Sequence, residues 1–385
     1  MVVRILVTGD NHLDNPSTQY GTKKNERQND FKTNFKVIID YALEHKVDIF
    51  LVCGDLFHNC RPSNTTRAWV MHQFRMLTES DISVFVITGH HDTPKSILSG
   101  VSPLKTHGES GHITFLENPT TPEAVDIGVD GTRIRVVGLG FNPSLRTDDD
   151  PLAVKLPPPE GDVNILMLHY PIIGFSGFIG DESKVSPDKF PKGYQLIVAG
   201  HFHTAQEKTI GDSLVVIPGS SERISFSEED SPKSFSVVEI SKGMKMKVDR
   251  IPLQCREMKT LTIKVNDGDD INKLVTEQIE HDCDRNLILR IRIEGLITAE
   301  TLGTYRRAPL QRIGDEKCFK LLLEDSESLR VRGLREIEPM ASIDPDEELL
   351  SYFDIRMEDL DEESKRVVEK AKERCIQLLE EVASN

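Results

Sequence analysis

The chain has 385 residues, 38% hydrophobic and 29% charged, which predicts a soluble globular protein of two or three domains; no apolar run approaches the ~20 residues that span a bilayer, and the first residues lack the features of a signal peptide. The formal net charge of −16 argues against autonomous, tight DNA binding, because nucleic-acid binders usually carry a basic face. The six cysteines are scattered without a Cys-x-x-Cys pair, which predicts free thiols, no structural zinc and a reducing, cytoplasmic location.

Residues 1–92 alternate strands and helices, the rhythm of a sheet with helices on its faces. Phe31, Phe35 and Ile38 recur at helical spacing, and Ser63 is a plausible N-cap. The expected elements are a strand at 2–8, a loop at 13–29, a helix at 30–45, a strand at 48–52, a helix at 63–78 and a strand at 82–87.

The following region, to about residue 251, predicts mostly β-structure. Short strands are expected within 112–140, and longer loops at 141–161 and 171–193 are rich in proline, glycine or acidic residues. Further strands are expected at 163–168, 196–199, 215–217, 234–240 and 245–251.

A second unit begins near Cys255 and predicts a small α+β domain of about 80 residues. Its expected elements are a strand at 259–265, a helix at 269–282, a strand at 286–293, a helix at 298–304 and a strand at 317–324. A proline-bounded linker at 339–345 leads to an acidic, helical segment at 346–385. An apolar stripe runs along this last helix, formed by Val368, Ala371, Cys375, Leu378, Leu379 and Val382.

Polar side chains follow five of the predicted strands, at the point where each strand ends. In open α/β sheets, ligands bind in the crevice at the carboxyl ends of the strands. One histidine or aspartate in such a place is usually structural, but five strand ends of this kind in order predict a shared site. They are Asp10-x-His12, Gly54-Asp55, Gly89-His90-His91-Asp92, His169 and Gly200-His201-x-His203.

Carboxylates mixed with imidazoles suit Mn²⁺, Fe, Zn²⁺ or Co²⁺ better than Mg²⁺, which prefers oxygen. Two such ions about 3.5–4 Å apart need a bridging ligand, and they bind phosphate oxygens and lower the pKa of a water. Asp55, which follows the apolar run at 48–52, is placed for the bridging role. No Ser/His/Asp triad or P-loop in the sequence offers a competing chemistry.

The ordered signature resembles that of the calcineurin-like metallophosphoesterases over roughly residues 4–203. The stretch Gly-Asp-Leu-Phe-His-Asn-Cys-Arg-Pro-Ser at 54–63 is similar to the nuclease subunit of the DNA double-strand-break repair complex, the Mre-eleven/SbcD family. The resemblance implies an α/β fold, with a metallophosphoesterase β-sandwich flanked by helices, a small α+β capping domain and C-terminal helices. The implied domains are a nuclease domain at 1–255, a DNA-binding capping domain at 256–338, a linker at 339–345 and an ATPase-binding segment at 346–385.

The resemblance further implies two Mn²⁺ ions per chain, although other divalent transition metals fit the same residue types. The implied ligands of the first ion are Asp10, His12, Asp55 and His203. The implied ligands of the second are Asp55, His90, His169 and His201.

Three further roles follow from the same resemblance. His91 is expected to stabilise the transition state or to protonate the leaving 3′ oxygen, with Asp92 orienting its ring. His58 and Arg61 are expected to contact substrate beside the metals. The alternative for His58 is a loop histidine without a role.

His90 departs from the family pattern, which has asparagine at this position. One interpretation is a conservative exchange of ligands, since an imidazole Nδ1 lies about as far along its side chain as an amide oxygen. The other is an impaired second metal site. We predict weak Mn²⁺-dependent nuclease activity, with the second ion less occupied than the first, and a gain of at least about tenfold in His90→Asn.

The resemblance implies a metal-dependent DNA nuclease of double-strand-break repair, with 3′–5′ exonuclease activity on double-stranded DNA and endonuclease activity on single strands. The expected partners are DNA, a coiled-coil ATPase of the Rad-fifty/SbcC type and a second copy of the chain, in the cytoplasm at the nucleoid and without a membrane. The apolar stripe would bind the ATPase, or alternatively pack on its own domain. Two rival functions are a phosphodiesterase on non-DNA substrates and a non-catalytic scaffold crippled at His90.

Overall fold

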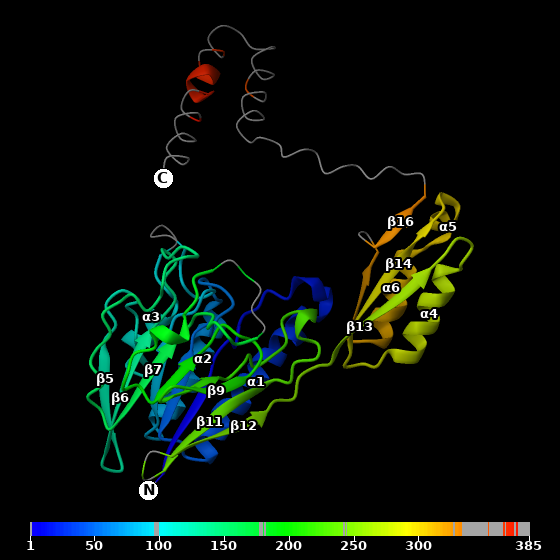
Figure 1. Cartoon of the computed structure of the whole chain (residues 1–385). Coiled ribbons are helices and arrows are strands. Elements are labelled where there is room, and N and C mark those ends of the chain that lie inside the picture. The colour runs from blue at the N-terminus through cyan, green and yellow to red at the C-terminus, as the bar shows by residue number, and fades with distance from the viewer. Residues whose placement is uncertain are drawn as a thin grey trace.

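The computed structural model describes residues 2–95, 100–176, 180, 182–241, 243, 245–325 and 328–332, together with 353, 365, 367–372 and 375. Two six-stranded sheets make up most of the molecule, and a four-stranded sheet with its own helices follows them in the chain (Figure 1). This arrangement confirms the expected α/β fold with a β-sandwich flanked by helices.

The first sheet has the strand order β12-β11-β1-β2-β3-β4. The central strands pair parallel, whereas the last two in the chain pair antiparallel at one edge. The strands are β1 (Val2–Thr8), β2 (Ile49–Cys53), β3 (Ser83–Ile87), β4 (Thr114–Phe115), β11 (Ser234–Ser241) and β12 (Met246–Pro252). Apart from β4, for which no bounds were predicted, each lies within one residue of its predicted bounds.

The second sheet has the strand order β5-β6-β7-β8-β10-β9, with parallel pairing in its centre and an antiparallel pair at each edge. The strands are β5 (Ala124–Val129), β6 (Thr132–Leu139), β7 (Val163–Leu168), β8 (Leu196–Ala199), β9 (Gln206–Ile210) and β10 (Ser213–Ile217). β9 was not predicted, because its residues QEKTI are mostly polar and its only partner is β10.

The central strands are buried on both faces, which explains their continuous apolar sequences. Successive side chains of a strand point to opposite faces. In β2, Ile49 and Leu51 therefore join the core between the two sheets, whereas Phe50 and Val52 join the core beneath the helices. All five residues of β2 are buried as a result.

Two long helices cover the outer face of the first sheet, α1 (Lys24–Glu44) and α2 (Asn64–Thr78). The predicted cap is confirmed, because the Ser63 side chain accepts a hydrogen bond from the Thr66 amide. The predicted loop at 13–29 is wrong in part, since it holds the short 3-10 helix η1 (Thr18–Lys23) and the start of α1. Arg27 stabilises this start through ion pairs with Asp30 and the distant Glu222.

Loop segments rather than long helices cover the outer face of the second sheet. Side chains from the loops before β7 and β8, among them Leu152 and Phe175, pack against Leu166 and Ile197. Of the short helices, η3 (Pro187–Lys189) lies in the loop before β8, whereas α3 (Leu104–Glu109) precedes β4 and η4 (Phe226–Glu228) precedes β11.

The third sheet pairs β14 with three neighbours, all of them parallel. Helices pack on it through residues such as Val275 and Leu310. The elements are β13 (Met258–Val265), α4 (Ile271–Asp282), β14 (Ile288–Ile297), α5 (Ala299–Thr304), α6 (Arg307–Lys317), β15 (Lys320–Glu324) and β16 (Leu329–Val331). Of these, α6 and β16 were not predicted.

The prediction of free thiols is wrong for two cysteines. Cys283 and Cys318 directly follow α4 and α6 and form a disulfide, with Cα atoms 5.1 Å apart. The pair is 35 residues apart in the sequence, and only the packing of the two helices side by side brings it together. The other four cysteines are free.

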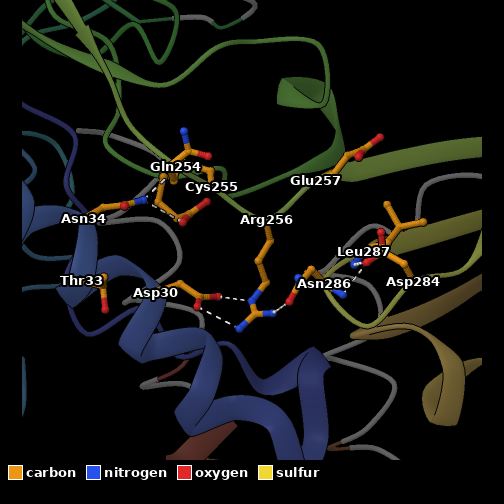
Figure 2. Close-up of a pocket in the computed structure, with 11 residues that line it drawn as sticks. Asp30, Thr33, Asn34, Gln254, Cys255, Arg256, Glu257, Asp284, Asn286 and Leu287 are labelled. Carbon is orange, nitrogen blue, oxygen red and sulfur yellow. Dashed lines mark hydrogen bonds and ion pairs between the residues drawn. The ribbon is translucent and has the colours of Figure 1, made fainter.

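Arg256 connects the β-sandwich to the third sheet. Its guanidinium donates to Asp30 and Glu26 of α1 and to Asn286 before β14, and it stacks 3.8 Å from the ring centroid of Phe319. Figure 2 shows this side chain in a pocket between α1 and the turn that precedes β14. The smaller unit is therefore held against the sandwich by charged and aromatic contacts.

The linker at 339–345 and most of the segment at 346–385 lie outside the described residues. Residues 367–372 are helical, in agreement with that part of the prediction. Within the part of the chain that the structure describes, no helix is long and apolar enough to cross a membrane.

Candidate metal centre

Four of the predicted ligands have left-handed backbone conformations directly beyond strands. Their φ angles are 48° for Asp10, 45° for His12, 49° for Asp55 and 81° for His201. Such conformations cost of order 1–3 kcal/mol each in a non-glycine residue and cluster at functional sites. Here the backbone holds two of them in place, since the Asp10 amide donates to the Gly54 carbonyl and the His12 amide donates to the Asp55 carbonyl, both at 3.0 Å.

Glycines in the signature permit close approach of the ligands. A Cβ on Gly54 would lie 2.3 Å from His169 Nδ1, and a Cβ on Gly89 would lie 2.2 Å from Asp55 Oδ1. Any larger residue would displace the side chains that the strand ends bring together.

Asp55 lies at the centre of the cluster and is 2% exposed. Its Oδ1 accepts a hydrogen bond from the His91 amide at 2.7 Å. Its Oδ2 lies 3.4 Å from His169 Nε2 and 3.9 Å from His12 Nε2. Burial alone would raise the pKa of Asp55, but the surrounding histidines, His169 foremost, hold it well below its usual range. This carboxylate therefore stays charged, and two histidine rings face the same one of its oxygens.

Asp10 is the second buried carboxylate. Its oxygens accept from the His201 amide at 2.9 and 3.1 Å, and Oδ1 lies 3.9 Å from His203 Nε2 and 4.0 Å from His169 Nε2. Burial raises the pKa of Asp10 to about 7 despite these neighbours. A cation between the two carboxylates would relieve this cost by favouring the charged form.

His169 is completely buried and held in one orientation. Its Nδ1 donates to the Cys53 carbonyl at 2.6 Å, and its Nε2 is directed at the two carboxylates and has no hydrogen-bond partner within the part of the chain that the structure describes. Burial alone would lower the pKa of this ring, but Asp55 and Asp10 outweigh it and raise the pKa to about 10. A histidine fixed through one nitrogen, with the other facing carboxylates, is typical of a metal ligand.

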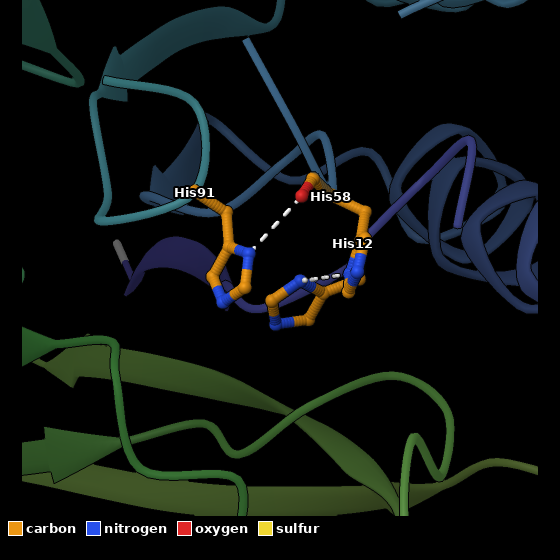
Figure 3. A group of neighbouring side chains, drawn as sticks. All are labelled: His12, His58 and His91. Atoms are coloured by element: carbon orange, nitrogen blue, oxygen red, sulfur yellow. Dashed lines mark hydrogen bonds between the residues drawn. The ribbon is translucent and has the colours of Figure 1, made fainter. Parts of the chain in front are cut away.

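Four histidine rings meet beside these carboxylates. His12 Nε2 lies 3.2 Å from His203 Nε2, and His12 Nδ1 lies 3.3 Å from His58 Nδ1. The ring of His91 is edge-on to that of His12, with centroids 4.8 Å apart (Figure 3). Burial lowers the pKa of His12 and lowers that of His58 to about 4, so both rings are neutral at pH 7 and offer lone pairs to a cation.

The side chains fit divalent metal ions. Among the described residues, three groups place one ligand atom each within 4.8 Å of the others: Asp10, His12 and His203; Asp10, Asp55 and His169; and His12, His58 and His91. The first two groups share Asp10 and mix carboxylate oxygen with imidazole nitrogen, the donor set expected for Mn²⁺, Fe or Zn²⁺.

A family model described as calcineurin-like phosphoesterase matches residues 3–205, more than half of the 385 residues. The chain belongs to this family. The match confirms the resemblance drawn from the five strand ends and covers nearly the same range.

Curated relatives of this phosphoesterase carry the name DNA double-strand break repair protein Mre11. The protein from Sulfurisphaera tokodaii is 26% identical over 298 residues, which cover 76% of this chain and 73% of that protein. The protein from Methanopyrus kandleri is 27% identical over 54% of this chain and 49% of its own length. The protein from Methanocaldococcus jannaschii is 27% identical over 66% of this chain and 68% of its own length.

In this phosphoesterase, Asp92 does not orient His91 as predicted. Asp92 is fully buried and accepts hydrogen bonds from the amides of Gly89 at 2.6 Å and Leu56 at 2.9 Å. The exposed His91 instead donates from Nδ1 to the His58 carbonyl at 3.0 Å. Asp92 thus ties the turn beyond β3 to the turn beyond β2 and positions His91 only through the backbone.

The two predicted substrate-contacting residues lie in different environments. His58 is half-buried and belongs to the histidine cluster, and Asn15 lies 3.3 Å from its Nδ1. Arg61 is exposed three residues further on, where its backbone amide donates to the Asn59 side chain. The structure thus brings His58 to the cluster, and Arg61 lies on the surface of the same loop.

His90 and His201 belong to none of the three groups above and face a carboxylate that sequence reasoning missed. Glu182 Oε1 lies 3.4 Å from His90 Nδ1, and Glu182 Oε2 lies 3.6 Å from His201 Nε2. Burial lowers the pKa of His90 and lowers that of His201 to about 3. Glu182 lies in a long loop without a motif, so only the fold reveals it.

A second missed carboxylate stands behind His203. Glu228 Oε1 accepts from His203 Nδ1 at 3.0 Å, and Glu228 Oε2 accepts from the buried Lys233 ammonium at 2.5 Å. Burial alone would raise the pKa of Glu228, but His203 and Lys233 lower it to about 2. A charged carboxylate that holds the far nitrogen of an imidazole fixes its tautomer and strengthens it as a ligand.

Proposed function

We propose that this phosphoesterase is a two-metal DNA nuclease of double-strand-break repair, an exonuclease on double-stranded DNA in the 3′–5′ direction and an endonuclease on single strands. The observation that carries the proposal is Asp55, a buried, charged carboxylate whose Oδ2 faces the Nε2 atoms of both His12 and His169. A carboxylate placed in this way can bridge two cations. The names of the curated relatives support DNA as the substrate.

The proposed ligands follow the sequence signature, with Mn²⁺ as the ion at both positions. The first position comprises Asp10, His12, Asp55 and His203. The second comprises Asp55, His90, His169 and His201. When bound, two divalent cations would supply positive charge for the phosphate oxygens and lower the pKa of a bound water.

Asp10 and Asp55 orient the centre through hydrogen bonds that they accept. Asp10 accepts a hydrogen bond from the backbone amide of His201, and Asp55 accepts one from the backbone amide of His91. Both carboxylates are thereby fixed before substrate arrives, and such preorganisation lowers the cost of reaching the transition state.

His91 is the proposed acid for the leaving 3′ oxygen. Because its Nδ1–H donates to the His58 carbonyl, the proton that can be exchanged with substrate lies on Nε2. The ring is exposed beside the buried cluster, where a phosphodiester can reach it. His58 and Arg61, from the loop after β2, are the proposed contacts to the DNA strand.

The proposed partners are DNA, a coiled-coil ATPase of the Rad-fifty/SbcC type and a second copy of the chain that packs through helices of the catalytic domain. The net charge of −16 supports a partner that contributes to DNA binding. The segment at 346–385, proposed to bind the ATPase, lies mostly outside the described residues. The unit at 256–338 is the proposed capping domain for DNA, and the proposed location is the cytoplasm at the nucleoid.

The test is cleavage of 3′-labelled duplex DNA and of circular single-stranded DNA by the purified chain in Mn²⁺, beside an aryl phosphodiester. Asp55→Asn is expected to lower all three activities by about 10³-fold or more, because it removes the shared negative charge worth several kcal/mol. The matched control is Asp212→Asn, the same change in the exposed turn between β9 and β10.

Each contrary outcome has a definite meaning. Hydrolysis of the aryl phosphodiester without cleavage of either DNA would point to a phosphodiesterase on another substrate. No Asp55-dependent hydrolysis of any substrate would favour a scaffold. Full activity of Asp55→Asn at saturating Mn²⁺ would contradict the two-metal proposal itself.

A further inference from the structure

Glu182 places a carboxylate between two rings of the proposed second metal position. Its two oxygens face different histidines, His90 Nδ1 at 3.4 Å and His201 Nε2 at 3.6 Å. The oxygen that faces His201 is buried and has no hydrogen-bond partner among the described residues. A buried carboxylate oxygen without such a partner is costly, so its position requires an explanation.

The distances point to a shared cation rather than to direct hydrogen bonds. An N–H···O hydrogen bond usually spans about 2.7–3.2 Å, which is shorter than both contacts. Ligand atoms about 2.1 Å from one metal ion lie roughly 3.0 Å apart at a right angle and roughly 3.4 Å apart at a tetrahedral angle. The two contacts are close to these ligand-to-ligand separations.

The backbone near Glu182 is anchored to the site. Val185 is fully buried, and its amide donates to the Pro171 carbonyl at 2.8 Å while its carbonyl accepts from the Ile173 amide at 3.0 Å. These bonds join the returning end of the loop to the residues that follow His169. Glu182 therefore lies near a hydrogen-bonded end of the loop, and the proposed ligand His169 lies at the other end.

The chemistry of the second position explains what an added carboxylate would contribute. Three of its proposed ligands, His90, His169 and His201, offer imidazole nitrogen, and only Asp55 offers oxygen. Mn²⁺ is well suited to carboxylate oxygen. Asp55 is shared with the first position, so its one negative charge is divided between two divalent ions. A second carboxylate would help to balance the charge of the second ion.

We propose that Glu182 is a ligand of the second divalent cation and that it sets the affinity of that position. The inference rests on the proposed two-metal function and adds to it a ligand outside the five strand ends. It also assigns a role to His90, whose ring and the Glu182 carboxylate bind the ion together.

The experiment counts bound metal in the full chain. Wild type, Glu182→Gln and Glu182→Asp are stripped with a chelator and titrated with Mn²⁺ by calorimetry and by the electron paramagnetic resonance of free Mn²⁺. Wild type should bind two ions per chain. Both variants should bind the first ion as wild type does and the second at least about tenfold more weakly, because Gln lacks the charge and Asp is one methylene too short. Glu123→Gln, an exposed residue before β5, is the matched control and should behave as wild type.

A spectrum separates a ligand from a residue that only orients His90. In the Co²⁺-loaded chain, loss of a carboxylate ligand changes the visible absorption of the second ion, so Glu182→Gln should have an altered spectrum. If Glu182 only oriented His90, the Gln side chain could still hold that ring by a hydrogen bond, and the spectrum would be unchanged. Suppose that wild type binds two ions. An unchanged spectrum of Glu182→Gln, or an unchanged affinity of the variants for the second ion, then overturns this inference and leaves the proposed function standing. Fewer than two ions in wild type overturns it together with the proposed function. Circular dichroism and melting of each variant establish that it is folded.

Discussion

The two halves of the proposed metal centre are built with different rigidity. In the first half, the remote nitrogen of His203 is held by Glu228, and Asp10 accepts the amide of His201. In the second half, His169 is fixed by the Cys53 carbonyl, but His90 and Glu182 come from a turn and a loop and face each other across 3.4 Å. The comparison teaches that strand ends can preorganise the ligands of the proposed first cation, whereas the proposed second position draws on side chains that the loops contribute. We therefore expect the first ion to bind more tightly than the second.

The largest loss of metal binding and nuclease activity should come from a substitution that disrupts both halves of the proposed centre at once. In Gly89→Ala, the new Cβ would lie 2.2 Å from Asp55 Oδ1 and would displace the carboxylate that both halves share. Overpacking of this kind costs about 1–3 kcal/mol of stability, so the protein should still fold. We expect nuclease activity to fall by about 10³-fold or more and both ions to be lost. Metal analysis and melting check this, with Gly128→Ala, where a Cβ meets no atom within 4 Å, as control. Retention of one ion would show that the halves are more independent than we describe.

A smaller effect should be confined to the first half. Glu228→Ala removes the acceptor for His203 and leaves the buried Lys233 without its carboxylate. Loss of such an outer partner typically lowers metal affinity by about 10–100-fold, while the unpaired charge lowers the melting temperature. Mn²⁺ titration should show the tighter ion weakened and the weaker ion unchanged.

Two further variants serve as controls for Glu228→Ala. Glu228→Gln keeps an oxygen that can accept from His203 and should lose less affinity than Glu228→Ala. Glu207→Ala breaks only an exposed ion pair with Arg250 and should leave both ions in place. Equal weakening of both ions in Glu228→Ala would contradict the division of the centre.

The smallest effect concerns the second half. The sequence alone predicts a rise of at least about tenfold in activity for His90→Asn. Because Glu182 stands 3.4 Å from His90 and supplies a hard oxygen, we expect the variant to differ from wild type by less than about threefold. Initial rates at several Mn²⁺ concentrations decide the matter, and a tenfold gain at any of them would mean that His90 impairs the site.

The parts of the fold that sequence predicts best are the buried parallel strands. β1, β7 and β8 were predicted at their observed bounds, because strands buried on both faces are rich in apolar residues, although β1 contains Arg4 and β7 contains Asn164. The polar edge strand β9 and the helix α6, whose apolar side is short, carry no comparable pattern. Their identity depends on partners elsewhere in the chain.

The same distinction applies to the site. His12, Asp55 and His169 could be placed together from sequence because each directly follows a strand or its turn, and strand ends converge in this fold. Glu182 and Glu228 could not, since each lies in a connection and acquires its role from a histidine that is distant in sequence. The role of Asp92 was misjudged for a related reason, because adjacency in sequence to His91 does not imply contact.

Backbone hydrogen bonds between the β1 and β2 segments continue beyond the ends of the two strands. The amides of Asp10 and His12 continue the same series of hydrogen bonds into the ligand turns, through the carbonyls of Gly54 and Asp55. Backbone amides in such a position exchange with solvent only when the sheet itself opens. We therefore expect local fraying not to release the proposed first cation, and the free energy of its binding to add to the global stability of the sandwich. We expect the proposed centre and the sheet to open as one cooperative unit.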